Sequence, residues 1–76
     1  MGRAGALEIP GVRRFGRCHV YVRGEPEDEV VAVPLGEVYA VSRAQLEGWH
    51  AVPAGEARRL VASLLGVGEG EVELRR

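Results

Sequence analysis

The feature that most constrains the fold is a single cysteine, Cys18, in a chain of 76 residues. One cysteine excludes an intramolecular disulfide, and a closed zinc site needs four cysteine or histidine ligands in spacings that this chain lacks. A hydrophobic core of this size supplies only about 3–5 kcal/mol, so natural domains of this length usually add a disulfide, a metal ion or a partner chain. We therefore expect one domain, residues 1–76, without metal or cofactor, that forms a homodimer.

The composition removes many classes of catalytic site. The sequence contains no lysine, asparagine or threonine, and its hydroxyl nucleophiles are limited to Ser42 and Ser63. Schiff-base chemistry needs a lysine, and the hydrolase and kinase signature motifs need lysine, asparagine or threonine. We therefore expect a protein that is not an enzyme.

Hydropathy and residue usage also bound where the protein acts. No hydrophobic run approaches the roughly 20 residues that span a bilayer, and the first ten residues lack the hydrophobic stretch of a signal peptide. We expect a cytoplasmic protein without membrane contact. Ten arginines without any lysine, and few thermolabile residues, make a thermophile-like composition.

Alternation of hydrophobic and polar residues predicts several short strands. The predicted strands cover residues 7–9, 17–23, 30–33, 37–41 and 71–75. In the second of them, Cys18, Val20 and Val22 share one side and should face the core. The polar run 24–29 separates this strand from the next one and predicts a hairpin with an acidic tip.

Two helices are predicted. Ser42 and Gln45 have the spacing of a capping box, which predicts a short helix from residue 43 to about residue 49. Hydrophobic residues at helical spacing predict a longer helix over 54–65 that ends at Gly66. The expected fold is therefore α+β: a small antiparallel β-meander with one long amphipathic helix, plus a short helix, packed on one face and a C-terminal strand.

Charge is segregated along the chain. Residues 1–24 carry five arginines against one glutamate, whereas residues 25–41 carry five carboxylates and no base. Opposite charges on neighbouring strands can pair across a hairpin, and this is the favoured interpretation. The other interpretation is a nucleic-acid contact through the arginine-rich strand entry, in which phosphates bind arginines. Its candidate residues are Arg13, Arg14, Arg17 and Arg23.

Reactive residues do not form a convincing catalytic pattern. Cys18 and His19 are neighbours, but successive strand residues point to opposite faces, so this pair should not act together. A catalytic pair would need His50 to lie over Cys18. The acidic run 25–29 lacks the ligand spacing and the glycine of a calcium-binding loop. These residues therefore predict no catalytic or metal site.

Several hydrophobic positions carry a family resemblance. Residues 39–42 after the meander, then Trp49, then 65–67 and Val72, are similar to the small PqqD-like recognition elements, which bind leader peptides of ribosomally made natural products. The resemblance covers about half of the chain. It implies a domain that adds a peptide as a strand to a sheet edge. The chain departs from that family in a shorter segment after Trp49 and in lacking the third helix.

Taken together, these patterns favour a small non-enzymatic interaction module that self-associates. Hydrophobic aromatic side chains are the usual anchors of such a surface. The candidates for the interaction surface are Phe15, Tyr21, Tyr39 and Trp49. A protein or peptide partner is compatible with this expectation, and a nucleic-acid-binding accessory protein or a peptide-binding recognition element is the alternative.

Overall fold

The computed structural model describes residues 16–44 and 48–76. The described elements follow in the order β1 (His19–Val22), β2 (Glu25–Pro26), β3 (Val30–Leu35), β4 (Val38–Arg43), β5 (His50–Pro53), the 3₁₀ turn η2 (Ala54–Glu56), α2 (Ala57–Leu65), the 3₁₀ turn η3 (Glu69–Glu71) and β6 (Val72–Arg75). This is the predicted α+β class, with one long helix and a C-terminal strand. The predicted strand over residues 7–9 lies outside the described residues.

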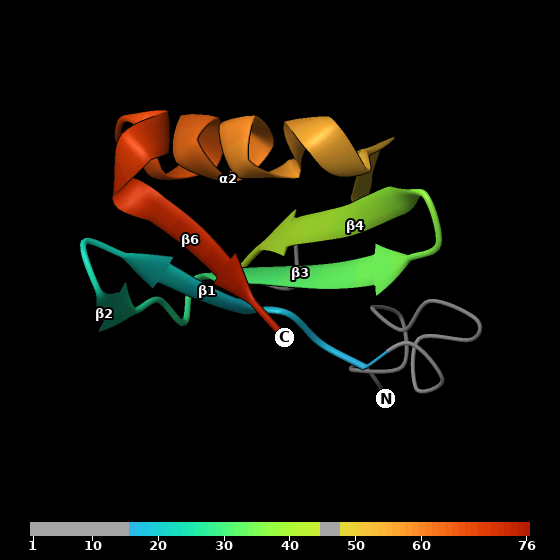
Figure 1. Cartoon of the computed structure of the whole chain (residues 1–76), viewed down its shortest axis with the longest axis horizontal. Helices are drawn as coiled ribbons and strands as arrows, with labels where there is room; N and C mark the ends of the chain where they lie inside the picture. The colour runs from blue at the N-terminus through green and yellow to red at the C-terminus, as the bar shows by residue number, and fades with distance from the viewer. Residues whose placement is uncertain (1–15, 45–47) are drawn as a thin grey trace.

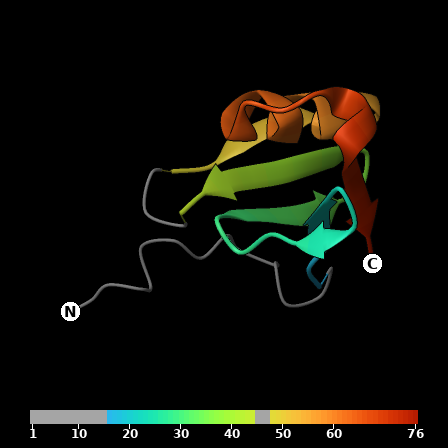
Figure 2. The ribbon, with the colours of Figure 1, turned by 90° about the vertical axis from the view of Figure 1, so that its left-hand side faces the viewer.

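The strands form two small antiparallel sheets, ordered β2-β1-β6 and β3-β4-β5. The sheets meet where Cys18 forms a β-bridge with Ala32, and the Cys18 N–H donates to the Ala32 carbonyl at 2.8 Å. Figures 1 and 2 show α2 lying over one side of the strands, with β6 beside β1. The fold therefore has two layers, a helix above strands that curve beneath it.

The predicted helix over 54–65 is confirmed, because η2 runs directly into α2. Its buried residues are Ala57, Val61 and Ala62. The helix ends at Gly66, whose φ of 71° lies in the left-handed region, and the Gly66 N–H bonds to carbonyls of the last turn. The hydrophobic spacing thus places one helix face on the strands, as expected from the sequence.

The main core lies between α2 and the helix-facing side of both sheets. Its buried members come from five elements or their flanks: Cys18, Val20, Val30, Ala32, Val41, Val61, Ala62 and Val72. The alternation predicted for strand 17–23 is confirmed, because Cys18 and Val20 are buried while His19 is exposed. Each fully buried valine contributes about 1.5–3 kcal/mol of hydrophobic stabilisation.

A second hydrophobic cluster lies on the opposite side of β3 and β4. It contains Val31, Val33 and Ala40, with Leu35 and Trp49 packed against them. Since Val30 and Ala32 belong to the main core, β3 is buried on both faces. A strand buried on both sides needs a continuous hydrophobic run instead of alternation, which is what β3 has.

The short helix predicted from residue 43 to about residue 49 is wrong at both ends. Arg43 is the last residue of β4, and Trp49 directly precedes β5, a strand that the sequence pattern did not predict. Residues 45–47 lie outside the described part of the chain. Ser42 does not act as a helix cap, because it belongs to β4 and is fully buried there. Pairing of β4 with β3 competes successfully with the local capping motif.

Candidate interaction surface

The three aromatic candidates that the structure describes lie in different places. Tyr21 lies on the outer side of β1, where the Arg75 guanidinium sits 4.3 Å from the centre of its ring. Tyr39 points to the opposite side and packs against the main core. Trp49 packs against the second cluster, and Phe15 lies outside the described residues. An aromatic patch that unites these side chains is therefore not what the described fold presents.

The structure describes two of the four arginine candidates. Arg13 and Arg14 lie outside the described residues, and Arg17 is exposed shortly before β1. Arg23 donates a hydrogen bond to the Glu71 carboxylate in an ion pair, and this bond raises the pKa of Arg23. Because Glu71 engages Arg23, the described part of the arginine cluster has less positive charge to offer a phosphate.

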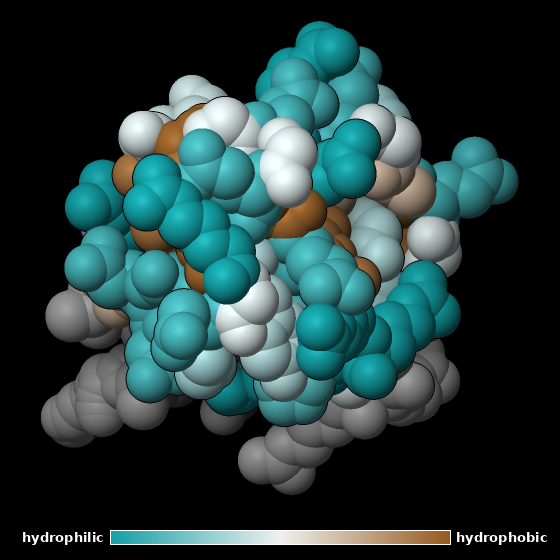
Figure 3. Space-filling view, turned by 60° about the vertical axis from the view of Figure 1, so that its left-hand side comes forward, coloured by the Kyte–Doolittle hydropathy of each residue, from teal (hydrophilic) through white to brown (hydrophobic). Residues whose placement is uncertain are grey.

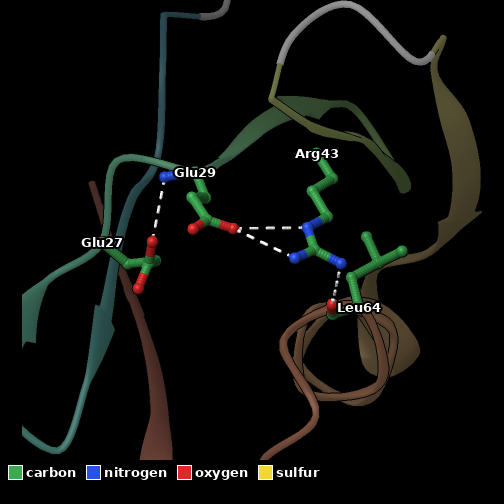
Figure 4. A network of polar contacts seen from close by, with 4 residues as sticks. All are labelled: Glu27, Glu29, Arg43 and Leu64. Carbon is green, nitrogen blue, oxygen red and sulfur yellow. Dashed lines mark hydrogen bonds and ion pairs between the residues drawn. The ribbon is translucent and has the colours of Figure 1, made fainter.

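The acidic loop pairs with β4. Figure 4 shows Arg43 donating from Nε and Nη2 to the Glu29 carboxylate, at 3.3 and 3.2 Å, and from Nη1 to the Leu64 carbonyl at 3.0 Å. The Glu29 N–H donates to the Glu27 carboxylate at 2.9 Å. Arg43 thus satisfies a carbonyl in the last turn of α2 and ties that turn to the loop before β3. The ion pairs among the described residues do not join this loop to Arg17 or Arg23.

The reactive side chains lie apart from one another. Cys18 is buried, and burial raises the pKa of its thiol. His19 is exposed on the other side of β1, while His50 is exposed on β5 in the other sheet. Among the described residues no group of three or more histidine, cysteine or carboxylate side chains is placed to hold a metal ion. This arrangement provides neither a nucleophile beside a base nor a set of metal ligands.

One open cavity lies where β1 separates from the loop before β3. Its volume is about 410 Å³. The polar residues in its wall are Arg17, His19, Tyr21, Glu27 and Asp28, which carry both signs of charge. This mixture matches no single class of charged ligand.

Two free edges of the sheets each carry a proline at an outward-pointing position. In an antiparallel pair, peptide groups of alternate residues point toward the neighbouring strand and away from it. The Ala54 N–H donates to the Glu37 carbonyl at 2.9 Å, so Ala54 points toward β4 and the residue before it, Pro53, points away from β4. The Glu27 N–H donates to the Val20 carbonyl at 2.8 Å, so the outward-pointing position of β2 is Pro26. Proline has no N–H, and both edges therefore lack a donor there.

The side of β3 that faces β1 follows the same pattern. The Ala32 carbonyl on that side accepts from Cys18, and two residues further along the same side lies Pro34. Proline is a common device that keeps sheet edges from pairing with other chains. Pro26, Pro34 and Pro53 thus each stand where another residue would direct its N–H away from the neighbouring strand of its own sheet.

The outer edge of β6 differs from the others. The Arg23 N–H donates to the Glu71 carbonyl at 2.7 Å, so Glu73 and Arg75 direct their peptide groups toward β1. Val72 and Leu74 consequently direct their peptide groups away from β1. The Val72 N–H is already used within the chain, because it donates to the Glu69 carbonyl of η3, so Leu74 leaves both its N–H and its C=O open while Val72 leaves only its C=O. Among the described elements β6 pairs only with β1, and Figure 2 shows it at the margin of the fold. This edge therefore presents donors as well as acceptors.

The side chains along β6 divide by face. Val72 is buried and Leu74 is half-buried on the helix side, whereas Glu73 and Arg75 are exposed on the outer side. Arg75 Nη2 lies 2.9 Å from Glu73 Oε1, and this hydrogen bond lowers the pKa of Glu73. Interpretation of the sequence alone missed this edge, because strand order and hydrogen-bond direction are needed to recognise it. The one sign of this edge in the sequence is that the last strand contains no proline.

Most large hydrophobic side chains among the described residues are buried or half-buried. Among the described residues the one large hydrophobic side chain classed as exposed is Val38. On the face drawn in Figure 3, hydrophobic residues appear as small separate patches within a mostly hydrophilic surface. No helix in the described part of the chain is long and hydrophobic enough to cross a membrane. A partner that binds this face would meet polar groups in the main.

The chain has no match among protein-family models, among curated proteins or among solved structures.

Proposed function

We propose that this domain is a small, non-enzymatic interaction module that binds an extended segment of a protein along the outer edge of β6. The observation that carries the proposal is the contrast between edges: Pro26 and Pro53 stand at outward-pointing positions of β2 and β5 and have no N–H, while Leu74 offers both an N–H and a C=O and Val72 adds a C=O. An extended segment that joins a sheet edge is a common mode of protein recognition.

The character of the surface supports recognition through the main chain. A docking site that depends on side chains usually has a buried hydrophobic centre with aromatic anchors. Here Tyr39 and Trp49 pack against the two hydrophobic clusters, and Tyr21 is covered on one side by Arg75. Hydrogen bonds to an exposed strand need no such patch, because the peptide groups themselves supply the affinity.

The placement of the reactive groups favours binding over catalysis. A cysteine nucleophile needs a lowered thiol pKa and a base within hydrogen-bond distance. Burial raises the pKa of the Cys18 thiol. His19 is exposed on the other side of β1, and His50 lies on β5 in the other sheet. Phosphate recognition is also disfavoured on the outer side of β1 and β6, where Glu71 and Glu73 accompany the arginines.

The proposal is tested by selecting eight-residue peptides from a random display library on the wild-type domain. Enriched synthetic peptides should shift the amide resonances of Val72 and Leu74 more than those of β5. The variant Leu74→Pro removes an N–H that points away from β1, so it should abolish binding while leaving the sheet intact.

The matched control is Ala51→Pro, which removes the outward-pointing N–H of β5 in the same way. This variant should bind the selected peptides as tightly as the wild type. Circular dichroism and thermal unfolding establish that both variants are folded. Binding that survives in Leu74→Pro, or peptides that shift only residues around the cavity beside Arg17 and Glu27, would contradict the proposal.

A further inference from the structure

We propose that the segment bound along β6 is β6 of a second copy of this chain, in an antiparallel pair whose two-fold axis passes beside Leu74. This inference rests on the proposed function and specifies its partner. The resulting dimer has one continuous sheet that runs from β2 through β1 and β6 into the same three strands of the second copy in reverse order. Such isologous pairing closes after two chains.

The direction of the peptide groups restricts the register. In an antiparallel pair, two residues that face each other both direct their peptide groups toward the partner or both direct them away. Leu74 directs its N–H and C=O outward, so it meets the partner's Leu74 as a hydrogen-bonded pair. In the same register the Val72 carbonyl accepts from the N–H of the partner's Arg76, while the Val72 N–H keeps its bond to the Glu69 carbonyl. The main-chain groups that the fold leaves at this edge are thereby used.

Charge complementarity selects this register over its neighbours. With the axis at Leu74, Glu73 faces the partner's Arg75 on the outer side of the sheet, and the same contact occurs twice by symmetry. Facing residues of this kind lie about 4.5 Å apart between Cα atoms, close enough for opposite charges to stabilise the pair. An axis at Glu73 would set Glu73 against itself. An axis at Val72 would set Glu71 against the partner's Glu73.

The helix side of the pair is complementary as well. Leu74 is half-buried and packs against the main core below α2. In the pair, the two Leu74 side chains lie next to each other across the axis and cover surface that the isolated chain exposes. A chain of this size, with one cysteine, gains stability from such an association, because a partner that binds only the folded state shifts the folding equilibrium.

Exchange of the two charges tests the register. Glu73→Arg sets arginine against arginine in the homodimer, and Arg75→Glu sets glutamate against glutamate. Each variant alone should self-associate at least about tenfold more weakly than the wild type in sedimentation equilibrium. In an equimolar mixture of the two variants every facing pair is again opposite in charge. The mixture should therefore form a heterodimer with affinity within about threefold of the wild-type homodimer.

A main-chain variant provides the second test. Leu74→Pro should be folded and monomeric at concentrations where the wild type and Ala51→Pro are dimeric. The inference is overturned if the wild type is monomeric, or if the two charge variants self-associate as strongly as the wild type. If the wild type is monomeric but library peptides still shift the amide resonances of Val72 and Leu74, the inference is overturned and the proposed function stands. If Leu74→Pro changes neither peptide binding nor self-association, the inference and the proposed function both fail.

Discussion

The two sheets of this domain contain three strands each, but they are stabilised in different ways. In the sheet β3-β4-β5, strand β3 is buried on both faces, with Val30 and Ala32 in the main core and Val33 in the second cluster. In the sheet β2-β1-β6, the helix side is buried, while the outer side carries charged and aromatic groups such as Arg75 over Tyr21. The first sheet thus has a strand that is buried on both faces, whereas the second sheet is buried on its helix side only.

This difference explains why the two sheets also have different edges. A strand buried on both faces gains its stability from hydrophobic contact, so it tolerates Pro34 near its end. Strand β6 gains its stability from one face and from hydrogen bonds with β1, and its outer edge retains the N–H of Leu74 as a main-chain donor and the carbonyls of Val72 and Leu74 as acceptors. Substitutions in each sheet therefore test whether stability depends on the buried strands and not on the exposed side of the other sheet.

The largest effect is expected for Val33→Asp. Val33 has 1% of its surface exposed, so the new carboxylate would lose its hydration without gaining a partner of opposite charge. The cost of several kcal/mol is comparable to the whole stability of a small domain, and the variant should be unfolded by circular dichroism. The control is Val38→Asp on β4, where 37% of the residue's surface is exposed and the stability should stay within about 0.5 kcal/mol. An unfolded control would show that the outer side tolerates no charge.

The second prediction concerns the seam between the sheets, at the bridge between Cys18 and Ala32. Because Cys18 is 4% exposed and burial raises its thiol pKa, the folded chain should react with a disulfide reagent at least about tenfold more slowly than the urea-unfolded chain. Equal rates in the two states would mean that the seam opens readily.

The same thiol predicts a pH dependence. Its folded-state pKa lies above the unfolded value, so the stabilisation is complete below the unfolded pKa and is lost as pH rises through the folded pKa. The free energy of unfolding should decline more at alkaline pH for the wild type than for Cys18→Ala. Parallel pH profiles for the two proteins would contradict this prediction.

A smaller effect of opposite sign is expected for Ser42→Ala in β4. The Ser42 hydroxyl is fully buried, and in the described structure it has no hydrogen-bond partner. Removal of a buried unpaired hydroxyl avoids its desolvation cost, so the variant should be more stable by about 1 kcal/mol in urea unfolding. A loss of stability would indicate that the hydroxyl is paired in solution.

The smallest effect on stability is expected on the outer side of β1 and η3. The ion pair between Arg23 and Glu71 is exposed, with 71% of the Arg23 side chain accessible, so solvent screens it. Arg23→Gln should leave the unfolding temperature unchanged within the error of calorimetry. A clear decrease in the unfolding temperature would show that the ion pair between Arg23 and Glu71 stabilises the fold, which the comparison of the two sheets does not predict.

Much of the fold could be predicted from local patterns. Alternation in residues 17–23, the hydrophobic spacing of the long helix and the role of Gly66 as its end all reflect interactions within a few residues. The prediction failed where a local pattern competed with pairing between strands. Ser42 and Gln45 match a capping box, but Ser42 pairs with Val31 inside the sheet, and a strand that was not predicted, β5, begins at His50.

By itself, the sequence determined the α+β class, the long helix, the buried side of β1 and the absence of a disulfide, because each depends on residue type or short-range periodicity. Only the tertiary structure decided which strands are neighbours and toward which side each peptide group points. Those two facts place Pro26, Pro34 and Pro53 at positions that point away from the neighbouring strand of their own sheet, and they leave Leu74 of β6 with an open N–H and C=O. The direction of a hydrogen bond depends on register with a distant strand, and register is a property of the assembled sheet.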